Sequence, residues 1–126
     1  MQRREIVKAF ALSAGVLIVL VALSTQVFAA QDVKVVLKEW TMELSRTSID
    51  IGTPVRFLVT NSATSKMPHS FRIEGQGLEA TTLAIAPGKN ATLEVTLPRA
   101  GQYKIYCPIP GHKEHGLVGD VEAGTF

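Results

Sequence analysis

Residues 101–122 read GQYKIYCPIPGHKEHGLVGDVE, and this stretch holds the chain's one cysteine and two of its three histidines. Apolar and polar residues alternate up to the cysteine, so Tyr103, Ile105 and Cys107 share one face of an extended strand. Two prolines and a glycine then interrupt the strand, and a further extended run follows at 117–122. The stretch therefore predicts two strands joined by a loop that carries chemically reactive side chains.

The chain upstream of this stretch also reads as short strands separated by turn residues, and it shows no convincing helical period. Gly52-Thr53-Pro54 and Pro87-Gly88-Lys89-Asn90 are such turns. The segment 75–86 fits either a strand or a helical turn. The expected strands cover residues 33–44, with a bend near Trp40, and 48–51, 55–61, 69–73, 91–97, 102–107 and 117–122. About eight short strands predict an all-β fold, a two-sheet Greek-key β-sandwich.

The N-terminal residues 1–29 have the composition of a signal peptide. Arg3, Arg4 and Lys8 form a basic start, and an uncharged apolar run follows at 9–23. Small residues then stand where a signal peptidase reads the chain, in Val27-Phe28-Ala29. This pattern predicts a signal helix that is cleaved after Ala29.

Two alternatives concern how this segment is used. The stretch 9–30 is nearly long enough to span a bilayer, so it could instead stay as an uncleaved membrane anchor. The run Arg3-Arg4-Glu5-Ile6-Val7-Lys8 also resembles a twin-arginine export signal, so the export route stays open between that route and the general secretory one. We expect residues 30–126 to form one exported domain, in the periplasm or on the extracytoplasmic face of the membrane. Membrane contact is expected only if the segment is uncleaved.

The net charge of the chain comes from its N-terminal segment. The formal charge is +2, and Arg3, Arg4 and Lys8 together with Glu5 account for all of it. Residues 30–126 are therefore formally neutral, and no basic patch argues for nucleic-acid binding. A domain of this size can fold on one core, and we expect a monomer.

The single cysteine points to a bound metal. Cys107 cannot form an internal disulfide, and a free thiol is a liability in an oxidising compartment, so something should occupy it. His112 follows five residues later, and a thiolate with imidazoles favours copper, zinc or iron over magnesium or calcium. His69 shares the inward strand face with Phe71 and Ile73. Alone it would be a core residue, but beside the other two side chains it becomes the candidate third ligand.

These residues resemble a known family. The loop from Tyr106 to His112, followed by Gly116-Leu117-Val118-Gly119, resembles the copper loop of the cupredoxins, the type 1 (blue) copper proteins. Its spacing is most similar to the rusticyanin and sulfocyanin type. Further matches are Asn61, Pro68-His69 and Phe71-x-Ile73, which resemble the first-histidine strand, and Gly101-x-Tyr103, which resembles the tyrosine corner. The resemblance covers nearly all of 33–122. It implies a cupredoxin-like sandwich that binds one Cu(I)/Cu(II) ion through His69, Cys107 and His112.

The axial position departs from the family pattern. The resemblance implies a methionine where this chain has Leu117, and leucine cannot coordinate copper. We expect a site closer to three-coordinate, with a raised potential, because loss of a weak donor destabilises Cu(II) more than Cu(I). His115 or Met67 could take the axial place instead. We favour Leu117, with His115 in solvent and Met67 in the apolar rim of the site.

Hydrogen bonds to the cysteine sulfur help to tune the potential in this family. Pro108 follows Cys107 and has no N–H to offer, so the backbone N–H of Ser70 is the remaining candidate donor. Tyr106 is adjacent to the cysteine and could be either a surface residue or an electron exit. For Trp40 and Met42 we expect packing alone.

The leading functional hypothesis is a one-electron carrier. An enzyme is not expected, because a multicopper oxidase or copper nitrite reductase needs many histidines for its second centre and this chain has three. The alternative is a periplasmic copper-binding or delivery protein without redox turnover, and zinc would also tolerate these ligands. The expected partners are redox proteins such as cytochromes or oxidases, which would dock near His112.

Overall fold

The computed structural model describes residues 30–126, which fold as nine β-strands and one short helix. The predicted signal helix and its alternative, the membrane anchor, lie outside the described residues. Within residues 30–126, no helix is long and apolar enough to cross a membrane. The elements, in chain order, are β1 (Gln31–Lys38), β2 (Thr41–Leu44), β3 (Ser48–Asp50), β4 (Pro54–Asn61), β5 (Arg72–Gly75), β6 (Leu78–Thr81), β7 (Asn90–Thr96), β8 (Gly101–Tyr106), α1 (His112–His115) and β9 (Val118–Gly124).

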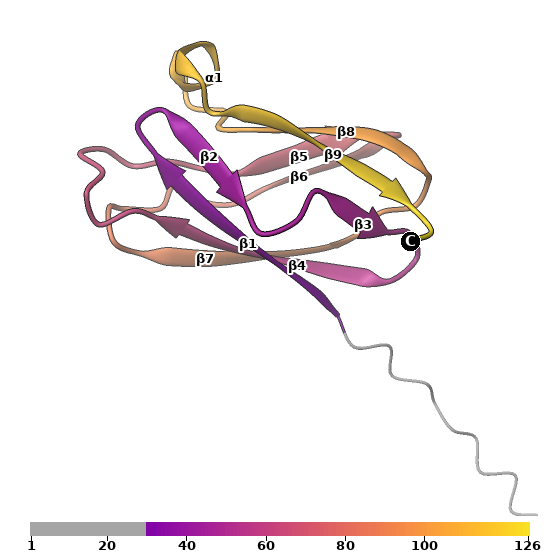
Figure 1. Cartoon of the computed structure of the whole chain (residues 1–126). Coiled ribbons are helices and arrows are strands. Elements are labelled where there is room, and N and C mark those ends of the chain that lie inside the picture. Colours follow the sequence, from indigo (N-terminus) through magenta and orange to yellow (C-terminus); the bar gives the residue numbers. More distant parts are fainter. Residues whose placement is uncertain (1–29) are drawn as a thin grey trace, which may run out of the picture.

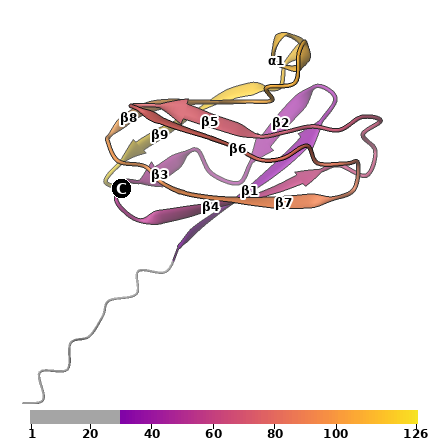
Figure 2. The same cartoon turned by 180° about the vertical axis from the view of Figure 1, so that it is seen from behind.

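The strands form two sheets that pack face to face (Figures 1 and 2). One sheet has the order β2-β1-β4-β7 and the other β3-β9-β8-β5-β6. The pairs β1–β4 and β3–β9 are parallel, and the remaining pairs are antiparallel. The helix α1 lies beyond one end of the sandwich, next to the β1–β2 connection (Figure 1). The predicted two-sheet β-sandwich is confirmed.

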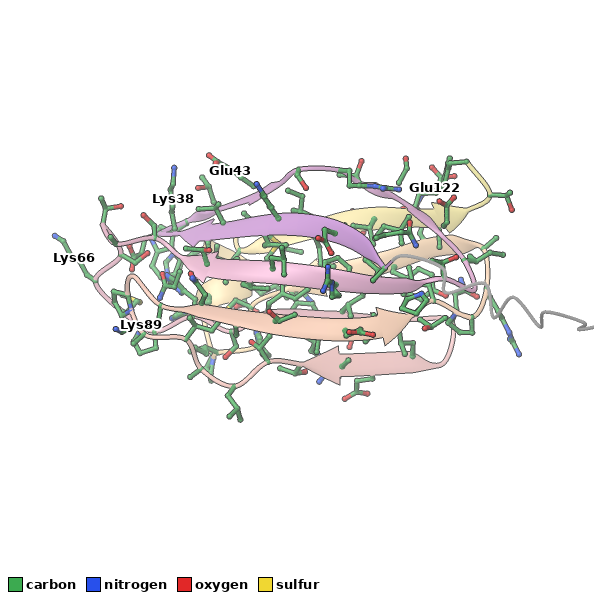
Figure 3. All side chains as sticks on the ribbon, turned by 90° about the horizontal axis from the view of Figure 1, so that it is seen from below. Lys38, Glu43, Lys66, Lys89 and Glu122 are labelled. Atoms are coloured by element: carbon green, nitrogen blue, oxygen red, sulfur yellow. The ribbon has the colours of Figure 1, made fainter. Side chains whose placement is uncertain are left out.

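The core lies between the sheets because apolar residues alternate with polar ones along each strand. Phe57 and Phe71 pack across it with ring centroids 5.0 Å apart. The fully buried core side chains also include Val33, Val35, Leu37, Ile49, Val55, Val59, Ile73, Leu97, Tyr103 and Ile105. Charged side chains such as Lys38, Glu43 and Lys66 point away from the core (Figure 3).

The expected strand at 33–44 is wrong, because the chain reverses at Glu39 and Trp40. β1 and β2 are an antiparallel hairpin in which Lys38 pairs with Thr41. The phase of the alternation changes at this turn: Val35 and Leu37 are buried, whereas Met42 and Leu44 are the more buried residues of β2. The change from odd to even positions is a sequence signal for the turn.

Two further expectations concern the second sheet. Of the two alternatives for the segment 75–86, the strand is the one that the structure has, as β6. The expected strand 69–73 is regular only from Arg72. His69 lies before it and forms an isolated antiparallel bridge with Ile85, with backbone hydrogen bonds of 3.1 and 2.8 Å.

The predicted tyrosine corner is confirmed. The hydroxyl of Tyr103 donates to the carbonyl oxygen of Arg99 at 2.7 Å and accepts from the N–H of Arg99 at 3.3 Å. This contact fixes the turn that leads into β8, the strand that delivers the cysteine to the end of the sandwich.

Candidate metal centre

Cys107 and His112 are held at the end of the sandwich by a loop with its own backbone hydrogen bonds. Cys107 follows β8 directly, and its N–H donates to the carbonyl oxygen of Leu117 at 3.0 Å. The N–H of His112 donates to the carbonyl oxygen of Ile109 at 3.0 Å. The carbonyl oxygen of His112 accepts from the N–H of Leu117 at 3.1 Å. Gly111 precedes α1 with φ +86°, a left-handed conformation that suits glycine. These backbone hydrogen bonds close the loop from Cys107 to Leu117.

His69 belongs to a segment far upstream of this loop, and its side chain lies beside those of Cys107 and His112. Its bridge to Ile85 places it opposite the Cys107 loop, and its side chain is fully buried. Asn61, at the end of β4, supports this region because its side-chain amide donates to the carbonyl oxygens of Ile85 at 2.8 Å and Met67 at 3.0 Å. The Asn61 side chain thus holds both the bridge partner of His69 and the backbone two residues before it.

The three predicted ligand side chains come together. Candidate ligand atoms of His69, Cys107 and His112 all lie within 4.8 Å of one another. The two Nδ1 atoms are 3.1 Å apart, and the cysteine Sγ is 3.4 Å from Nδ1 of His112. His69 and Cys107 are fully buried, and His112 is 8% exposed.

The donor set fits a soft transition metal. One thiol and two imidazole nitrogens converge in a buried position, which is the trigonal set of blue-copper sites and also a set that zinc accepts. Burial lowers the pKa of His69, and the neighbouring His112 lowers it further, while the nearby Glu39 carboxylate opposes both. The lowered pKa favours the neutral imidazole, which is the form that binds metal.

The backbone donor to the cysteine sulfur is present as predicted. The N–H of Ser70 donates to Sγ of Cys107 at 3.4 Å. Ser70 is itself buried, at 5% exposed, although simple alternation with the inward-facing His69 and Phe71 would direct it outward. Regular alternation of buried and exposed side chains starts only with β5 at Arg72. The two residues before it, Ser70 and Phe71, are therefore both buried.

The three candidates for the axial position lie in different environments. Leu117 is fully buried directly before β9. His115 is exposed at the end of α1, as expected, and its ring stacks on Trp40 with centroids 4.6 Å apart. Met67 is partly buried, and its backbone is held by Asn61 and Glu39. The axial role of Leu117 stays a prediction.

Two residues at the site were not predicted, Glu39 and Trp40 in the β1–β2 turn. The indole of Trp40 contacts the imidazoles of His112 and His69 edge-on, with centroids 5.1 and 6.2 Å apart. Trp40 therefore packs, as expected, but against the candidate ligands. Glu39 places Oε1 3.3 Å from Nε2 of His69. The phase change described above could have located this turn, but nothing local in the sequence places it beside the site.

The neighbours of Glu39 favour the ionised form of its carboxyl group. Partial burial raises its pKa, but the backbone N–H groups of Lys66 and Met67 that donate to it, and the nearby His69, together lower the pKa below its usual value. The turn thus presents a negative charge on the outer side of the His69 ring.

Comparison with known proteins is consistent with this geometry. A family model described as a cupredoxin-like domain matches residues 11–118. The chain belongs to the cupredoxin-like family. Among curated proteins, no significant match was found. The buried His-Cys-His cluster of this cupredoxin-like chain fits one copper ion.

Solved structures share the cupredoxin-like fold at low sequence identity. Auracyanin B superposes with a TM-score of 0.63 at 18% identity, covering 77% of this chain and 91% of that one. The dithionite-reduced auracyanin of the photosynthetic bacterium Roseiflexus castenholzii has a TM-score of 0.60 at 17% identity, with coverages of 77% and 99%. The copper nitrite reductase of Nitrosomonas europaea has a TM-score of 0.61 at 17% identity, but this chain covers only 42% of it.

Proposed function

We propose that this cupredoxin-like chain is an exported type 1 copper protein that binds one copper through His69, Cys107 and His112 and carries single electrons. The observation that supports the proposal best is the convergence of these three ligand atoms within 4.8 Å in a buried position. The proposal covers the ligand roles, the export and the redox function together.

The chain's own residues suit electron transfer. Bound copper would supply a one-electron Cu(I)/Cu(II) couple. The β-sandwich, the closed loop at Cys107 and the bridge at His69 hold the ligands in place, which keeps the reorganisation on electron transfer small. The Ser70 N–H stabilises negative charge on the sulfur, and the burial of Cys107 excludes water from it.

The same arrangement suggests where a partner would dock. His112 is the least buried of the three proposed ligands, and the neighbouring exposed loop residues Pro108, Pro110 and Gly111 are uncharged. We propose that redox partner proteins, such as cytochromes or oxidases, dock near His112. A location in the periplasm or on the extracytoplasmic face of the membrane belongs to the same proposal.

A carrier is favoured over an enzyme by the histidine count. The nitrite reductase and a multicopper oxidase with the same fold are more than twice as long as the region that this chain matches. The chain has three histidines in all, which is too few for a second copper centre of the kind those enzymes need.

The proposal is tested by visible and EPR spectra of the purified, copper-loaded protein, followed by cyclic voltammetry. We expect an intense blue thiolate-to-Cu(II) band and reversible one-electron cycling without loss of copper. Release of Cu(I) to an acceptor without reversible cycling would favour a delivery protein. A colourless protein that retains zinc in preference to copper would contradict the proposal.

A further inference from the structure

The Glu39 carboxylate connects the β1–β2 turn to the first histidine of the site. Its Oε1 accepts the N–H of Lys66 at 2.9 Å and that of Met67 at 3.2 Å, and it lies 3.3 Å from Nε2 of His69. The side chain of Glu39 is 20% exposed, while that of His69 is fully buried. This one oxygen atom thus contacts both the backbone that leads to His69 and the imidazole ring of His69.

The two nitrogens of the His69 ring face different groups. Nδ1 faces His112, and Nε2 is buried with no regular hydrogen bond, so the Glu39 oxygen beside it is its polar neighbour. The N–H direction departs from ideal hydrogen-bond geometry, but the two atoms are in contact. An ionised carboxylate can only accept, so it favours the tautomer with the proton on Nε2. That tautomer leaves the lone pair of Nδ1 directed toward the other candidate ligands.

We propose that Glu39 is a positioning residue of the metal centre: it holds His69 in the Nε2–H tautomer and places a negative charge behind this ligand. The charge strengthens the binding of Cu(II) more than that of Cu(I), because the attraction grows with the charge of the ion. Glu39 therefore lowers the midpoint potential, in opposition to the effect expected of Leu117. The copper part of this inference rests on the proposed function, whereas the tautomer part concerns the protein alone.

The alternative explanation is that Glu39 only fixes the backbone of Lys66 and Met67 through its two hydrogen bonds. Glu39→Gln distinguishes the two explanations, because the amide oxygen can still accept both backbone N–H groups while the negative charge is lost. We expect Cu(II) affinity to fall about tenfold, at the lower end of the effect of such partners. If Cu(I) affinity is unchanged, the potential rises by about 59 mV for the same tenfold change. A potential and a Cu(II) affinity equal to those of the unaltered protein would overturn the proposal.

A matched control and a metal-free readout complete the experiment. Glu43→Gln removes a negative charge in β2, where Glu43 is exposed and paired with Lys38 at 3.6 Å, and should leave both quantities unchanged. In the metal-free protein, long-range proton–nitrogen NMR should show His69 as Nε2–H, and Glu39→Ala should mix the tautomers. An unchanged tautomer in the alanine variant would also count against the proposal. A protein that binds no copper would refute the proposed function, while this NMR measurement would still test Glu39.

Discussion

The Nδ1 atoms of His69 and His112 lie 3.1 Å apart, although 43 positions separate the two residues in the chain. His112 arrives on the loop after β8, and His69 arrives through its bridge to Ile85 on the other side of that loop. Both rings present Nδ1 to the space that Sγ of Cys107 also faces. The site therefore depends on the correct pairing of the second sheet, and variants of Cys107 and His69 test it separately.

Replacing the thiol should remove the colour. Cys107→Ser takes away the chain's one thiol, which lies beside both histidines, so the intense thiolate-to-copper band should disappear from the visible spectrum. The EPR hyperfine splitting should become that of ordinary tetragonal Cu(II). A variant that stays blue would show that the ligand assignment is wrong.

Replacing the upstream histidine should weaken the site without abolishing it. His69→Ala leaves Cys107 and His112 in place, so copper should bind more weakly and added imidazole should restore the spectrum. If His69 were only a core residue, the free energy of unfolding would fall by roughly 1–3 kcal/mol and the copper spectra would not change. Spectra with and without imidazole, read beside a denaturant titration, distinguish these outcomes.

The axial position is tested by changing the potential in a graded way. Leu117→Met adds a weak thioether donor, which should stabilise Cu(II) and lower the midpoint potential, and Leu117→Gln should lower it further. If His115 were the axial ligand, Leu117→Met would change little, and His115→Ala would raise the potential. Cyclic voltammetry resolves such shifts, since about 60 mV corresponds to a tenfold change in a one-electron equilibrium.

The indole of Trp40 should protect the copper. Trp40→Ala removes the ring that contacts His69, His112 and His115, so water should reach the ligands and copper should dissociate faster to a chelator. Trp40→Phe retains an aromatic cover and should behave more like the unaltered protein. Leu83→Ala, at a side chain that is 89% exposed, is the control for loss of apolar surface. Equal dissociation rates in all four proteins would contradict a shielding role.

The tyrosine corner should matter for stability and not for copper. Tyr103→Phe removes a hydroxyl that makes two hydrogen bonds to Arg99, and we expect the free energy of unfolding to fall by about 0.5–1.5 kcal/mol. The copper spectrum should stay the same, because the hydroxyl lies at the start of β8 and the cysteine follows its end. A shifted spectrum would show that the corner also sets the geometry of the loop.

The sequence by itself determined the sandwich, the loop from Cys107 to His112 and the candidate role of His69. These features are local or periodic: alternation over a few residues sets which face is buried, and the backbone links Cys107 to His112 directly. The resemblance to the cupredoxins, carried by the same residues, agrees with the family match and the fold.

The tertiary structure alone decided how the outer part of the site is built. The reversal at Glu39 and Trp40 is set by pairing between β1 and β2, and the placing of this turn over the site depends on β1 lying beside β4. A sequence pattern indicates which residues are buried, but it does not show which distant segment packs over a given site. The contacts of Trp40 with the imidazoles and of Glu39 with His69 follow from long-range strand pairing, and so only the folded chain reveals them.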